Sequence, residues 1–143
     1  NQHSTEMLRS LLDVILQYCN ARYEVIDTML AKGKGHILVK RFFQLLEENY
    51  QKNISVNEYA SQLAITPHHL TQTIKELTGK TASKIIQEKQ LLETKRLLTH
   101  TNLSVTEISS MLNFSDQSYF TKFFKRMTGK TPLAFRMKYT KTT

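Results

Sequence analysis

Apolar residues recur along most of the chain at the three- and four-residue spacing of an α-helix. Within residues 4–31 the spacing is carried by Leu8, Leu12, Ile15, Cys19 and Ile26. Residues 37–51 carry a second, broad apolar face. Only four glycines and two prolines interrupt the chain. We therefore expect helices throughout, with a break and linker at residues 31–36.

The remainder of the chain contains an internal repeat of about 50 residues. The segment Ile54–Glu58 matches Leu103–Glu107, and Thr78–Thr81 matches Thr128–Thr131. The offset is 49 at the start of the unit and 50 at its end, so one extra residue enters between Leu112 and Phe120. Turns tolerate such insertions, which places a turn inside each copy.

Both copies show the plan of a short helix, a tight turn and a second helix. Each short helix begins with a serine that is followed three residues later by a glutamate, which is the pattern of a capping box. The second helix begins after Thr66-Pro67 in one copy and after Ser115-Asp116 in the other, and it ends at a glycine in both. This plan predicts one helix-turn-helix at about residues 54–79 and another at about 103–129.

A further helix, near residues 82–99, is expected between the two units. At 1.5 Å per residue it would be about 27 Å long, which suits recognition helices placed about 34 Å, one turn of DNA, apart. A helical-repeat solenoid is the alternative for such a period, but two copies are too few for a stable one. We predict an all-α fold with two helix-turn-helix subdomains, a long linker helix and an extra N-terminal helix, divided into residues 1–36 and 37–143.

Charge is distributed unevenly along the chain. The net charge is +8, and residues 54–143 hold 13 basic and 6 acidic side chains, against 7 and 6 in residues 1–53. A basic part beside a near-neutral part favours a polyanionic partner, with a generally basic surface as the alternative. No apolar run reaches the length of a membrane span. Cys19, the sole cysteine, fits a reducing cytoplasm and is expected to be a small buried hydrophobic side chain.

Residues 105–136 carry a dense set of specific residues. The set is Glu107-Ile108-Ser109, Asn113 to Phe120, Phe124-Lys125-Arg126, Thr128 to Pro132, and Arg136. It resembles the C-terminal signature of the AraC/XylS family of transcription regulators, and a looser resemblance extends over about residues 37–139. The resemblance implies a bacterial, cytoplasmic regulator that binds double-stranded DNA. It also implies an activator that engages RNA polymerase.

Several residues depart from the pattern of that family. Glycine usually stands where Asn113 is found, and Asn tolerates the left-handed backbone conformation better than most residues. The first unit has Ala64 at the equivalent position. Ile74 replaces the usual phenylalanine, and Glu76 adds a negative charge. In the linker helix, Gln90 and Thr94 replace the usual arginine and alanine.

Bases are read by side chains on the first turns of a recognition helix, whereas phosphate contacts fix its position. Glutamine can pair with adenine through two hydrogen bonds, lysine favours guanine, and the threonine methyl can contact thymine. By resemblance, the candidates for base contacts are His68, His69, Thr71, Gln72, Gln117, Ser118, Thr121 and Lys122. The candidates for phosphate contacts are Thr66, Lys75, Lys80, Tyr119, Lys125, Arg126 and Lys130.

Other interpretations of these residues are weaker. His68 and His69 are adjacent, so their side chains diverge by about 100° on a helix. They have no evident third ligand, and we expect no metal and no cofactor. The helical spacing of the phenylalanines from 114 to 135 indicates a core rather than a platform for stacked bases. Without the resemblance, Lys122, Lys125 and Arg126 would suit a solvated helix face.

Two other classes of function have less support in the sequence than sequence-specific DNA binding. The chain has no glycine-rich phosphate loop and no convergent catalytic set, so we expect no enzyme. A basic module that binds DNA through charge alone is the alternative. Residues 4–31 are expected to form a homodimer or to join a missing effector domain, and packing against the DNA-binding body is the other possibility.

Overall fold

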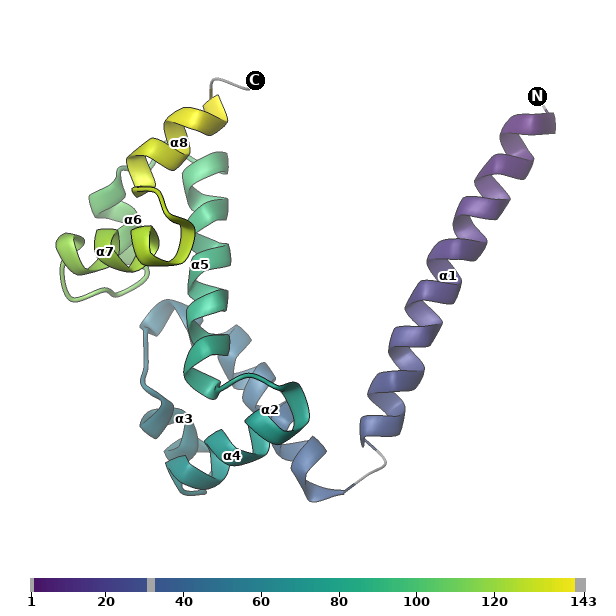
Figure 1. Ribbon diagram of the computed structural model, residues 1–143, viewed down its shortest axis with the longest axis horizontal. Helices are drawn as coiled ribbons and strands as arrows, with labels where there is room; N and C mark the ends of the chain where they lie inside the picture. The colour runs from purple at the N-terminus through teal and green to yellow at the C-terminus, as the bar shows by residue number, and fades with distance from the viewer. Residues whose placement is uncertain (1, 31–32, 141–143) are drawn as a thin grey trace. The chain divides into compact units, whose positions relative to one another are not determined.

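The computed structural model describes residues 2–30 and 33–140, with the side chains of residues 4–22 and 33–140. Every regular element in these ranges is helical (Figure 1). The elements are α1 (Gln2–Leu30), α2 (Lys34–Asn49), the short 3₁₀ helix η1 (Tyr50–Lys52), α3 (Val56–Gln62), α4 (Pro67–Thr78), α5 (Ala82–His100), α6 (Val105–Met111), α7 (Gln117–Thr128) and α8 (Pro132–Thr140). The fold is all-α, with helix-turn-helix units α3–α4 and α6–α7, as the sequence predicted.

The chain divides into two compact units, residues 1–38 and 39–143. The first contains α1, a continuous helix of 29 residues. The break expected at residues 31–36 is shorter in the structure, because α2 already begins at Lys34. Gly33 precedes it with a φ of 117°, and residues 31 and 32 lie outside the described part. None of the described helices is both long and apolar enough to cross a membrane.

The prediction that Cys19 is buried is wrong, because the cysteine is exposed. Its neighbours on α1 share this exposure: Leu8, Leu12 and Ile15 are 60%, 55% and 57% exposed. The helical spacing correctly identifies an apolar face here. The spacing does not say what, if anything, covers that face.

Local capping fixes the ends of the helices in the second compact unit. Ser55 and Ser104 form complete capping boxes with Glu58 and Glu107, so α3 and α6 begin as predicted. The N-caps of α4, α5 and α7 are Thr66, Thr81 and Asp116, whose side chains each accept a backbone N–H. The helices α4 and α7 end at glycines with φ of 77° and 80°, a conformation that costs glycine little.

Helix α5 is the central strut of this unit, with α3–α4 near its N-terminal end and α6–α7 beside its C-terminal part (Figure 1). It contacts α4, η1, α6 and α8. Near its start Ile85 and Ile86 are buried, and near its end Leu97 and Leu98 join the core of the second helix-turn-helix. Helix α5 therefore packs against both helix-turn-helix units, α3–α4 and α6–α7.

Aromatic side chains fill the core around the second unit. The rings of Phe114 and Phe120 meet edge to face at 5.0 Å, and those of Phe124 and Phe135 at 5.5 Å. Arg136 on α8 donates from Nε to the carbonyl oxygen of Leu98 at 3.0 Å, near the end of α5. The phenylalanines thus form a core, as their spacing indicated. Arg136 provides a hydrogen-bond donor for a carbonyl group near the C-terminal end of α5.

Candidate nucleic-acid interface

The turn inside each unit is a Schellman motif with a left-handed residue that is not glycine. In the first unit Ile65 N–H bonds the carbonyl oxygen of Ala60, and Ala64 N–H bonds that of Ser61, both at 3.0 Å. In the second unit Phe114 and Asn113 donate in the same way to Ser109 and Ser110. Ala64 has a φ of 57° and Asn113 a φ of 56°, so both turns share one geometry.

The two candidate recognition helices bury equivalent faces. In α4 the buried side chains are Leu70, Thr73 and Ile74, and in α7 they are Phe120, Phe123 and Phe124. These positions are 50 residues apart throughout, which is the offset of the repeat at its end. The opposite faces of α4 and α7 are therefore equivalent as well, and they carry the candidate contact residues.

On α4, the candidates His68, His69, Gln72 and Lys75 are exposed, and Thr71 is half-buried. The Gln72 amide donates to the Glu76 carboxylate at 3.1 Å. This bond leaves the amide oxygen and one N–H of Gln72 able to meet a base edge. Thr66, a candidate for phosphate contact, uses its hydroxyl to cap the backbone N–H of His69.

On α7, the candidates Gln117, Ser118 and Lys122 are exposed, and Thr121 is half-buried. Thr106 on α6 donates its hydroxyl proton to Oε1 of Gln117 at 2.6 Å. The bond fixes the orientation of the amide and leaves its NH₂ group to donate. Sequence reasoning missed this role of Thr106, although the residue stands in the repeated segment.

The phosphate candidates do not share one environment. Lys75, Lys125 and Arg126 are exposed, and Tyr119 is 53% exposed at the start of α7. Lys80 is also exposed, but its ammonium is paired with Glu88 at 2.9 Å, so a phosphate would have to compete with that carboxylate. The partner Glu88 was not predicted.

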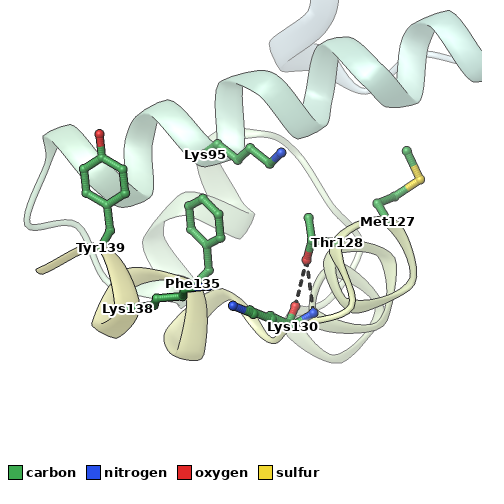
Figure 2. Close-up of a pocket in the computed structure, with 7 residues that line it drawn as sticks. All are labelled: Lys95, Met127, Thr128, Lys130, Phe135, Lys138 and Tyr139. Carbon is green, nitrogen blue, oxygen red and sulfur yellow. Dashed lines mark hydrogen bonds between the residues drawn. The ribbon is translucent and has the colours of Figure 1, made fainter. Parts of the chain in front are cut away.

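Lys130, the repeat equivalent of Lys80, lies instead at a pocket of about 750 Å³ with Lys95 and Lys138 (Figure 2). Phe135 and Tyr139 contribute the aromatic part of its lining. The Lys130 ammonium contacts the Lys138 ammonium, which holds the pKa of Lys130 below its ordinary value. Lys130 therefore differs from the exposed Lys125 and Arg126, because it is half-buried and lies beside a second ammonium.

The equivalent faces of α4 and α7 differ in charge. Positions 75 and 125 are both lysine, but position 72 is glutamine where 122 is lysine, and position 76 is glutamate where 126 is arginine. With neutral histidines, the exposed face of α4 has no net charge from these residues, whereas that of α7 carries three positive charges. Attraction to a polyanion is thus concentrated on α7.

Metal chemistry finds no support in this region. Across the described residues, no three or more His, Cys, Asp or Glu side chains lie where they could share a metal ion. His68 and His69 are both exposed at the start of α4. What the arrangement offers is hydrogen-bond donors, acceptors and positive charge on two equivalent helices.

Comparison with known proteins places this arrangement in a defined class. A family model described as a helix-turn-helix domain matches residues 59–138. The chain is 30% identical over 101 residues to the probable transcription factor PqrA of Proteus vulgaris, which covers 69% of this chain and 83% of PqrA. The protein is therefore a helix-turn-helix regulator of the class that binds DNA. It belongs to the AraC/XylS family of transcription regulators.

Two further similarities extend this result. The HTH-type transcriptional activator RhaR of Escherichia coli K12 is 23% identical over 133 residues, covering 93% of this chain, while the chain spans only 47% of RhaR. The solved DNA-binding domain of AdpA, a global transcriptional factor in complex with a target DNA, has a TM-score of 0.64 at 22% identity. It covers 71% of this chain and 91% of the AdpA domain, so the fold is shared.

Proposed function

We propose that this protein is a sequence-specific regulator that reads two successive major grooves of double-stranded DNA with α4 and α7. The observation that carries the proposal is the equivalence of the two exposed helix faces, related by the 50-residue offset and held on one strut, α5. Two such faces on one body suit two grooves on the same side of a duplex. The division into residues 1–36 and 37–143 is part of this proposal.

The proposed mechanism separates attraction from reading. Lys122, Lys125 and Arg126 supply charge that draws the duplex towards α7. Gln117, held by Thr106, then offers its NH₂ group to a base acceptor, and Gln72 offers its remaining groups from α4. The proposal also includes the remaining candidates, for which the structure offers less support. They are His68, His69, Thr71, Ser118 and Thr121 for bases, and Thr66, Lys75, Lys80, Tyr119 and Lys130 for phosphates.

The test is a selection from randomised duplex DNA, followed by binding of the enriched site across a salt series. We expect a motif with two half-sites about one helical turn apart. Gln117→Ala should weaken discrimination at one base pair by roughly 0.5–1.5 kcal/mol, because it removes a single neutral hydrogen bond to the base. Lys125→Ala should weaken binding to all duplexes and reduce the salt slope by roughly one. Lys40→Ala, which removes an exposed charge from α2, is the matched control.

A module that binds DNA through charge alone gives a different result. It enriches no motif, its binding fades uniformly as salt rises, and Gln117→Ala binds like the wild type. The fixed amide of Gln117 favours the sequence-specific function over this alternative, because a purely electrostatic contact gains nothing from an oriented hydrogen-bond donor.

We further propose that α1 joins two copies of the chain in a parallel pair. Leu8, Leu12, Ile15 and Cys19 follow one another at spacings of four, three and four, the seam of a coiled coil, and they are exposed in the single chain. A register that aligns the two copies places the two Cys19 thiols across the seam. A homobifunctional thiol reagent of short span should therefore produce a covalent dimer.

The control for this pairing is Ile15→Asp, which places a charge in the seam and should abolish both the cross-link and the dimer seen by sedimentation. A wild-type chain that sediments as a monomer at micromolar concentration and fails to cross-link would refute the pairing. Junction of α1 to an effector domain would then be the better account of this helix.

An activator that works in the bacterial cytoplasm through RNA polymerase is the physiological role we propose. RhaR is named as a transcriptional activator, and PqrA as a probable transcription factor. Transcription in vitro from a promoter that carries the enriched site tests the role directly. Stimulation supports an activator, and inhibition at the same occupancy contradicts it.

A further inference from the structure

Two asparagines from distant parts of the chain form a pair of hydrogen bonds, in which Asn53 bonds the backbone of Asn113 and Asn113 bonds the backbone of Lys52. Nδ2 of Asn53, just before α3, donates to the carbonyl oxygen of Asn113 at 3.2 Å. Nδ2 of Asn113, in the turn between α6 and α7, donates to the carbonyl oxygen of Lys52 at 2.8 Å. The pairs are 60 and 61 residues apart in sequence, so the bonds join the start of one helix-turn-helix to the turn of the other.

A third amide ties this pair to the strut. Gln90, in the middle of α5, is only 4% exposed and donates through Nε2 to Oδ1 of Asn53. Both polar ends of the Asn53 side chain are therefore engaged, the oxygen by Gln90 and the nitrogen by the Asn113 backbone. A partly buried amide with both ends bonded is held in one orientation.

Other long-range side-chain bonds of the described chain do not cross between the units in this way. Lys89 on α5 bonds Glu47 on α2, and Arg136 on α8 bonds the end of α5, so neither bond joins the two helix-turn-helix units. Each helix-turn-helix unit packs against α5 and is thereby held in place on that helix. The amide chain Gln90–Asn53–Asn113 adds a direct connection from one unit to the other.

We propose that Asn53, Asn113 and Gln90 form a clamp that sets the separation and mutual orientation of α4 and α7, and thereby the spacing of half-sites that the protein accepts. Asn113 begins the segment that leads directly into α7, and Asn53 precedes α3, which leads into α4. A change at the clamp therefore shifts one recognition helix relative to the other without altering either reading face. The three residues are positioning residues, and their effect on spacing rests on the proposed function.

The chain offers a matched pair of variants for the test. Asn113→Gly keeps a residue that accepts the left-handed conformation and removes only the side-chain amide. Ala64→Gly places the same residue at the equivalent turn of the first unit, where no clamp exists. Asn53→Gly, at a φ of 53°, opens the clamp from its other side. Each single variant leaves one hydrogen bond between the two units, so the double variant, which leaves neither, should have a larger effect than either alone.

The first measurement needs no DNA. In a Cys19→Ser background, spin labels on Cys residues placed at the exposed positions Lys75 and Lys125 report the distance between α4 and α7. We expect a narrow distribution in the parent chain and after Ala64→Gly, and a broader one after Asn113→Gly or Asn53→Gly. An unchanged distribution in both clamp variants would overturn the proposal.

The second measurement uses the selected DNA site and copies with one or two base pairs inserted between the half-sites. The loss of one hydrogen bond, from Nδ2 of Asn113 to the carbonyl oxygen of Lys52, sets a scale of roughly fivefold for the fall in spacing preference after Asn113→Gly. Affinity for the site without inserted base pairs should change less than the preference for that site over the sites with insertions. A preference equal to that after Ala64→Gly would refute the role in spacing. A parent chain that selects no site, but whose distance distribution broadens in the clamp variants, would instead refute the proposed function.

Discussion

Replacing Ala64 by glycine should stabilise the protein, although it removes a methyl group. Ala64 adopts a φ of 57° in the turn between α3 and α4, where its two flanking backbone hydrogen bonds hold the Schellman geometry. Its side chain is exposed, so the methyl group contributes little packing. The effect of the substitution is therefore set by backbone conformation.

The magnitude follows from two opposing terms. The left-handed conformation costs a residue with a Cβ about 1–2 kcal/mol. Glycine removes that cost but has about 0.5–1 kcal/mol more conformational entropy to lose on folding. The net expectation for Ala64→Gly is a gain of about 0.5–1 kcal/mol, equivalent to a rise in Tm of roughly 2–8 °C for a domain of this size.

Urea denaturation followed by circular dichroism gives the free energy of unfolding directly. The control is Ala134→Gly, which makes the same change at an exposed position inside α8 and should cost about 0.5–1 kcal/mol. Opposite signs for the two variants are the expected result. If Ala64→Gly destabilises the protein as much as Ala134→Gly does, the turn between α3 and α4 stores no left-handed strain.

Three further predictions concern single side chains. Arg136→Ala should lower the free energy of unfolding by about 2–3 kcal/mol in urea, because the carbonyl oxygens of Leu98 and Thr101 lose a charged donor. Burial raises the pKa of Tyr59 to about 12, so folding stabilises its neutral form. The contribution of Tyr59 to the free energy of unfolding should therefore be constant below pH 10 and fall between pH 10 and 12. Denaturation at a series of pH values should show this loss in the wild type and not in Tyr59→Phe. Glu76→Gln should strengthen DNA binding a few-fold at low salt, measured by fluorescence anisotropy, and a gain that persists undiminished at high salt would contradict an electrostatic cause.

The helices of the second compact unit could be predicted because their ends are determined locally. Ser55 with Glu58, and Ser104 with Glu107, need only their own four residues to form a capping box. Glycine at 79 and 129 likewise stops a helix wherever the rest of the chain lies. The internal repeat then predicts two successive helix-turn-helix units, and the distance between its copies predicts the helix that connects them.

Contacts between distant residues could not be predicted in the same way. Asn113 and Gln90 were visible in the sequence only as departures from a family pattern, since nothing local indicates that both connect to Asn53. Lys80 and Lys130 occupy equivalent positions of the repeat, yet one pairs with Glu88 and the other lies beside Lys138. The prediction that Cys19 is buried failed for the same reason, because the spacing of apolar residues defines a helix face but does not say what packs against it.

The unequal charge of α4 and α7 implies an order of events in time. Under the proposed function, the three cations of α7 would steer a duplex that diffuses towards the protein, so we expect this helix to make the first encounter, at a rate that falls as salt rises. We expect helix α4, whose corresponding side chains carry no net charge, to dock afterwards in a step that depends less on salt. The charges of α7 would then mainly set how fast the complex forms, and the contacts of α4 would contribute mainly to how long it lasts.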